Sequence, residues 1–207
     1  MRGLLKWTLV LGLALGMASV AQAQRQRPAF GGGAFLLQNE GVQKELNITD
    51  EQKTKLKEAI EKVREDNKDI IAKGFQNITR EDREKLAKAT NEAVGKVLDE
   101  KQVKRFKQIQ IQTQGAVAFQ NPQVQSALKL TDDQKDKIKK ISDESREKMR
   151  ELFQGGGNRE ENAKKFAELR KETMEKAIGV LTNDQKKTWK DLTGKPFEVR
   201  LGRRPNT

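Results

Sequence analysis

The sequence predicts an all-α protein built from two tandem repeats of long amphipathic helices, arranged as helical hairpins or a curved bundle. Three observations predict it. Paired identities recur at a fixed distance along the chain, four copies of a short motif mark helix starts, and apolar residues after each motif recur every three or four positions. The composition agrees, because only 4 of 207 residues are Pro and aromatic residues make up 5%. Such a chain suits slender helices better than a thick core.

The N-terminal residues predict a secretory signal peptide, residues 1–23. Arg2 and Lys6 provide positive charge, residues 7–20 are largely apolar, and Ala21-Gln22-Ala23 fits the small-x-small pattern of a cleavage site. We therefore expect cleavage between Ala23 and Gln24, and a periplasmic or secreted protein. The alternative is an uncleaved anchor, but about 14 apolar residues are short for a span that needs roughly 20. No later segment of the sequence is apolar enough to form a transmembrane helix.

The rest of the chain contains two similar halves. Gln38-Asn39 and Gln120-Asn121 open the same pattern 82 residues apart, and ITDEQ and LTDDQ recur at the same distance. We interpret residues 36–114 and 118–194 as two helical repeats that share a five-residue motif of the form LTxxQ. Residues 24–35 before them and the basic residues 195–207 after them contain Pro and Gly and lack a helical period, so we expect flexible ends.

The five-residue motif occurs twice in each predicted repeat, as ITDEQ, LDEKQ, LTDDQ and LTNDQ. Its pattern is that of a capping box. A Thr or Asp at the N-cap accepts a hydrogen bond from a first-turn N–H, and the Gln three residues later reaches back to the N–H of the cap. We interpret the motif as structural and expect it to begin four helices, at Ile48, Thr49 and Gln52; Leu98, Asp99 and Gln102; Leu130, Thr131 and Gln134; and Leu181, Thr182 and Gln185.

Apolar residues follow these starts at helical spacing. One stripe in the first repeat includes Leu56, Ile60 and Val63, and the second repeat has Ile138, Ile141, Met149, Leu152 and Phe153. A second helix in each repeat carries a similar stripe. The simplest interpretation is that these stripes form the core. The alternative is that part of the apolar surface stays open and binds partners. The sequence does not identify the client-binding residues.

The residue inventory excludes several classes of site. The chain has no His and no Cys, which removes Ser-His-Asp triads, thiol nucleophiles, disulfides and His or Cys metal ligands. We predict no enzyme activity and no catalytic, metal or cofactor-binding residue. The formal net charge is +12, but the helices mix both signs of charge and aromatic residues are few, so nucleic acid is not a favoured partner. Basic ends such as Arg203-Arg204 favour an anionic surface polymer instead.

The repeated motif, its spacing and the signal peptide together resemble the Spy/CpxP-like periplasmic LTxxQ proteins, over nearly all of residues 36–194. LTDDQ and LTNDQ match the motif fully, whereas ITDEQ has Ile for Leu and LDEKQ has Asp for Thr. The resemblance implies bent helices that form a curved sheet, with two protomers associated into a thin cradle. It also implies either a chaperone for unfolding envelope proteins or an inhibitor of a stress-sensing kinase. The metal-binding members use His, which is absent here.

The expected function is that of an exported, ATP-independent chaperone or envelope-stress protein that binds unfolded or envelope proteins on a helical surface. The alternative is a structural or regulatory module that binds one envelope partner or an anionic surface polymer. Because one chain contains the motif pattern twice, we expect either a pseudo-dimeric monomer or a homodimer of duplicated chains.

Overall fold

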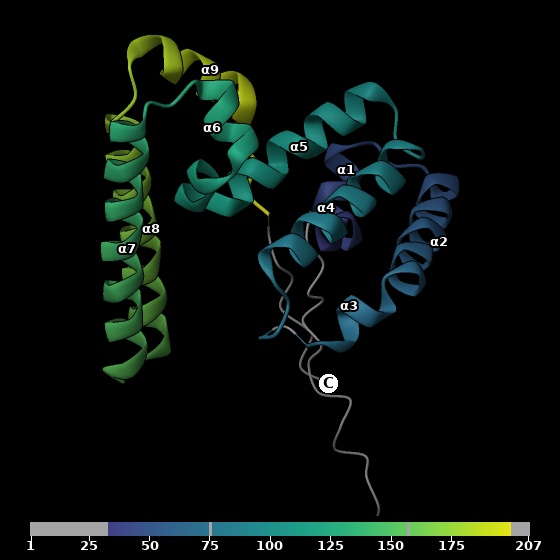
Figure 1. Ribbon diagram of the computed structural model, residues 1–207, viewed down its shortest axis with the longest axis horizontal. Helices are drawn as coiled ribbons and strands as arrows, with labels where there is room; N and C mark the ends of the chain where they lie inside the picture. The colour runs from purple at the N-terminus through teal and green to yellow at the C-terminus, as the bar shows by residue number, and fades with distance from the viewer. Residues whose placement is uncertain (1–32, 75, 157, 200–207) are drawn as a thin grey trace, which may run out of the picture.

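The computed structural model describes residues 33–74, 76–156 and 158–199. Within these residues the chain forms helices and no strand, which confirms the predicted all-α class (Figure 1). The first half comprises η1 (Ala34–Gln38), α1 (Glu40–Glu45), α2 (Asp50–Asp66), α3 (Lys68–Ala72), α4 (Arg80–Gly95) and α5 (Glu100–Gln114). The second half comprises η2 (Gly115–Gln120), α6 (Pro122–Leu128), α7 (Asp132–Gln154), α8 (Arg159–Gly179) and α9 (Asn183–Thr193).

The two halves present their main elements in the same order. A 3₁₀ turn and a short helix precede a long helix, which packs against a return helix, and a final helix follows. Positions in α1 and α2 correspond to positions 82 residues later, and positions in α4 and α5 to positions 83 residues later. α5 runs from the first half to the second, where it contacts α9 and η2 (Figure 1).

Each half has its own apolar core, and α5 contributes to both. Phe106 and Ile109 of α5 lie in the first core with Val42, Leu56 and Val94. The second core contains Phe119 and Trp189, whose rings stack with centroids 4.2 Å apart, and Ile111 at the end of α5 packs against it. No helix among the described residues is both long enough and apolar enough to span a membrane.

The long helix breaks in the first half and continues in the second. The side-chain amide of Asn67 donates to the carbonyl of Val63 at 2.8 Å, and α2 ends at this point. An Asn that bonds a carbonyl of the preceding turn competes with the helical hydrogen bonds. The change of direction lets Ile70 of α3 fold inward, where it is 8% exposed. Met149, a better helix former, occupies the corresponding position of α7, which runs unbroken to Gln154.

The return helices carry a buried threonine at corresponding positions, with different hydrogen bonding. Thr173 of α8 is 6% exposed, and its hydroxyl lies 2.6 Å from the carbonyl of Leu169 and 2.8 Å from the hydroxyl of Ser145. Thr90 of α4 is 1% exposed, and its hydroxyl has no hydrogen-bond partner among the described residues. Val63 stands where the second half has Ser145. A buried hydroxyl without a partner costs about 1–3 kcal/mol.

The substitution Thr90→Val is expected to raise the free energy of unfolding by about 1 kcal/mol, because it removes an unsatisfied hydroxyl and keeps the side-chain shape. Thr173→Val is the matched control and is expected to lower the free energy by a similar amount, because it removes two satisfied contacts. Urea denaturation followed by circular dichroism measures both. A shift of both variants in the same direction would contradict this interpretation of the two hydroxyls.

Candidate functional site

The motif residues lie where two helix starts meet in each half. Each cap side chain accepts a hydrogen bond from the main-chain N–H of its motif Gln, and the Oε1 of that Gln accepts from the N–H of the cap at 2.9–3.1 Å. The structure places Thr49, Asp99, Thr131 and Thr182 at these N-caps. The residues before the caps, Ile48, Leu98, Leu130 and Leu181, are all buried.

In the first half the two motif glutamines also bond each other. Gln52 Nε2 donates to Gln102 Oε1 at 2.7 Å, and Gln102 Nε2 donates to Gln52 Oε1 at 3.1 Å. The two amides also reach main-chain carbonyls beside the opposite helix start, those of Val97 and Leu46, at 3.2 and 3.0 Å. Each glutamine therefore caps its own helix and ties it to the other helix start.

The second half repeats this arrangement. Gln134 Nε2 donates to Gln185 Oε1 at 2.7 Å, and Gln185 Nε2 donates to Gln134 Oε1 at 2.9 Å. The carbonyls of Val180 and Leu128 accept from the same two amides at 3.0 and 3.1 Å. The capping-box pattern alone does not predict this pairing of glutamines.

The amino acid at the third position of each of these helices carries the sequence signal for the pairing of the glutamines. A carboxylate also closes a capping box, as Asp82 does with Thr79 at the start of α4, a fifth box that the sequence analysis missed. A carboxylate accepts but does not donate, whereas an amide does both. All four motif copies have Gln at this position, which a capping role alone does not require.

Exposed ion pairs stand at these helix starts, and those of α2 and α7 occupy corresponding positions. Lys53 donates to Asp50 at 2.7 Å, and Lys135 donates to Asp132 at 2.8 Å. The hydrogen bond and the charge of each lysine hold the pKa of its aspartate below the usual range. Both carboxylates are exposed, so water screens the pairs and their contribution to stability is small.

The end of the α7–α8 hairpin exposes apolar side chains, and it stands away from the other helices in Figure 1. Phe153 is 73% exposed, and its ring lies against that of Phe166 with centroids 4.6 Å apart. Met149 and Leu152 beside them are partly buried. We call these four residues the tip patch. Exposed side chains of both signs lie on the same stretch of the two helices, those of Lys148, Arg150 and Lys164 and those of Glu147, Glu151 and Glu160.

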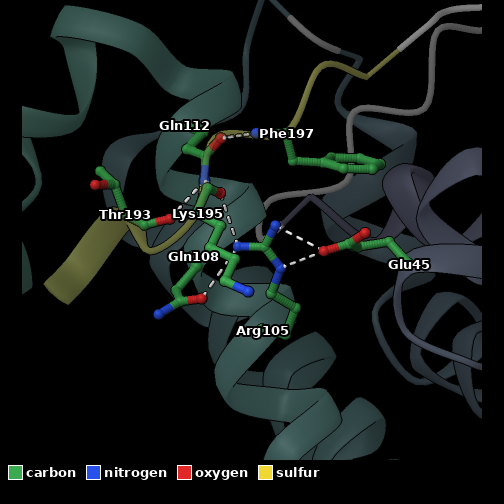
Figure 2. Close-up of polar contacts among 7 residues, drawn as sticks. All are labelled: Glu45, Arg105, Gln108, Gln112, Thr193, Lys195 and Phe197. Atoms are coloured by element: carbon green, nitrogen blue, oxygen red, sulfur yellow. Dashed lines mark hydrogen bonds and ion pairs between the residues drawn. The ribbon is translucent and has the colours of Figure 1, made fainter. Parts of the chain in front are cut away.

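The chain beyond α9 returns to the first half (Figure 2). Gln112 of α5 donates to the carbonyls of Thr193 and Lys195 and accepts from the N–H of Phe197 at 2.8 Å. Arg105 of α5 donates to the carbonyl of Lys195 at 3.0 Å and pairs with Glu45 of α1 at 2.7 Å. Sequence reasoning missed all of these contacts.

The two ends that were expected to be flexible are only partly within the described residues. Residues 195–199 of the C-terminal segment make the contacts above, and Ala34 of the N-terminal segment is buried at the start of η1. Residues 24–32 and 200–207 lie outside the described residues, as does the predicted signal peptide with its cleavage site between Ala23 and Gln24.

Among the described residues, no group of three or more His, Cys, Asp or Glu side chains is placed to hold a metal ion. Comparisons with protein-family models, with curated proteins and with solved structures found no match.

A double-mutant cycle tests the paired glutamines. Gln134→Ala and Gln185→Ala are each expected to lower the free energy of unfolding by about 1–2 kcal/mol, because each removes one of the two hydrogen bonds of its capping box and the cross-link. Together they are expected to cost less than the sum, because either substitution alone already breaks the pair. Urea denaturation followed by fluorescence of Trp189, which lies in the second core, measures the effect.

The control combines Gln134→Ala with Gln102→Ala from the other half, and these effects are expected to add within about 0.5 kcal/mol. Full additivity of the same-half pair would show that the amide–amide contact carries no energy of its own.

Proposed function

We propose that the protein is an exported, ATP-independent chaperone or envelope-stress protein, and that its tip patch binds unfolded segments of other proteins. The observation that carries the proposal is the exposure of Phe153 beside Phe166, Met149 and Leu152. In the first half, the residue that corresponds to Phe153 is Ile71, which is smaller and partly buried. The resemblance of the motif pattern to the LTxxQ proteins and the predicted signal peptide support the same assignment.

The chemistry of the tip patch suits weak binding to many sequences. Burial of apolar surface contributes about 25 cal/mol per Å² and has no directional requirement, so unrelated apolar segments can satisfy it. Exposed side chains of both signs of charge surround the patch, so the apolar contact rather than net charge selects the client. Lys148 and Arg150 also offer methylene stems that extend the apolar contact. A patch of a few side chains holds a client reversibly, so that release needs no nucleotide.

Light scattering tests this proposal. Residues 24–207 are added at stoichiometric ratios, without nucleotide and at physiological salt, to several unrelated proteins that are denaturing. We expect broad suppression of aggregation, and a several-fold weaker effect for the variant with Phe153→Ser and Phe166→Ser, because the apolar contact is lost. The matched control is Val117→Ser, which removes an apolar side chain that is 55% exposed in η2 and is expected to retain full activity.

A basic inert protein of similar size controls for nonspecific charge. Suppression that this protein matches, or that Phe153→Ser and Phe166→Ser leave unchanged, would contradict a role for the tip patch. Suppression of only one protein would favour the alternative of a module for a single envelope partner.

A further inference from the structure

Residues 195–199 lie on the first half as a peptide ligand lies in a binding site. The ring of Phe197 lies over α1, and a Cβ on Gly41 would be 3.9 Å from its Cζ atom. The guanidinium of Arg105 stands 5.9 Å from the centre of the same ring. Phe197 and Val199 both pack against the first apolar core. The ring of Phe197 therefore packs against α1 and α5, and Val199 extends the contact with the first core.

The polar contacts in this site are hydrogen bonds to the main chain of residues 195–199. Gln112 donates to the carbonyl of Lys195 and accepts from the N–H of Phe197, both at 2.8 Å. Arg105 donates to the same carbonyl of Lys195 at 3.0 Å. The side chains of Lys195 and Glu198 are exposed, and those of Phe197 and Val199 are partly buried. The segment thus uses its main chain and two apolar side chains at alternate positions.

Contacts within the first half orient Arg105, as Figure 2 shows, and Gln108 also donates to the carbonyl of Asp191 in α9 at 3.1 Å. Glu45 of α1 accepts from two nitrogens of the Arg105 guanidinium, at 2.7 Å each. The third nitrogen, Nη1, also bonds Gln108 Oε1 at 3.2 Å and remains directed at the segment. A guanidinium fixed on two sides presents its remaining donors in one geometry, which lowers the entropy cost of binding.

The second half offers a natural comparison, because it lacks this set of residues. The positions that correspond to Gly41, Glu45, Arg105 and Gln108 carry Gln123, Ala127, Thr188 and Asp191. α9 ends at Thr193, so Gln112 has no helical counterpart. The shared pattern of the two halves therefore does not account for the site.

We propose that α1 and α5 form a binding site for an extended peptide with apolar side chains at alternate positions, as in Phe-x-Val, and that residues 195–199 occupy it in cis. Gly194 has φ 63°, and a Cβ there would overlap the amide of Gln108, so glycine allows the chain to turn from α9 into the site. A competing segment of the same chemistry releases the link between α9 and the first half. This inference does not depend on the proposed chaperone function.

Fluorescence anisotropy of a labelled peptide with the sequence of residues 194–199, GKPFEV, tests the site. Residues 24–207 with Phe197→Ser and Val199→Ser are expected to bind it at least about tenfold more tightly than the unaltered chain, whose own segment competes. Adding Gln112→Ala to that variant is expected to abolish the gain. Gln123→Ala, an exposed glutamine of α6, is the matched control and is expected to leave it unchanged.

Three results would overturn the proposal. The first is that the variant with Phe197→Ser and Val199→Ser binds the peptide no more tightly than the unaltered chain. The second is that a peptide with Ser at both apolar positions binds equally well. The third is that adding Gln112→Ala leaves the tighter binding unchanged. Circular dichroism and Trp189 fluorescence establish that each variant is folded.

Hydrogen exchange of the unaltered chain provides a test without substitution. The N–H of Phe197 is expected to exchange at least about 100-fold faster than that of Ile109 in α5, because the segment leaves the site without global unfolding. Equal exchange rates would mean that the segment is a fixed part of the fold.

Discussion

The amide side chains of four glutamines hold the helix starts of this protein together. The first turn of a helix leaves main-chain N–H groups without partners, and a capping box satisfies them locally. Gln52 and Gln102 do this and also exchange hydrogen bonds across 50 residues of sequence. An amide has both a donor and an acceptor, so one side chain serves its own helix and a neighbour. The junction thereby joins the start of α2 to that of α5, and the start of α7 to that of α9.

Local chemistry explains why the sequence predicts the helices and their caps. Apolar spacing and the Thr-x-x-Gln pattern act within a few residues, so they can be recognised without knowledge of the tertiary structure. The glutamine pairing joins segments far apart in sequence, and a capping rule that treats Gln and Glu alike does not reveal it. The break at Asn67 escapes prediction for a related reason. The apolar stripe continues through Ile70, and only the bond from Asn67 to Val63 shows where the helix ends.

The C-terminal contact lies beyond what a local pattern indicates. Pro196 and the lack of helical period indicate a flexible end when the segment is considered alone. Its partners, Gln112 and Arg105, lie more than 80 residues earlier, with Lys195 separated from Arg105 by 90 positions. Proline also reduces the number of conformations that an unbound segment loses when it binds. Pro196 therefore disfavours a helix when the segment is considered alone, and it also lowers the entropy cost when the segment binds.

The two halves share one order of elements, so a comparison between them separates the features that this fold requires from those found in one half only. The glutamine pairs occur in both halves, as a constraint of folding demands. The exposed Phe153 and the site around Gln112 each occur in one half, and the other half keeps its helices without them. Stability alone does not select an aromatic ring at 73% exposure, because burial is what makes such a side chain stabilising. The asymmetry between the halves is therefore the structural ground for proposing the tip patch and the peptide site as binding surfaces.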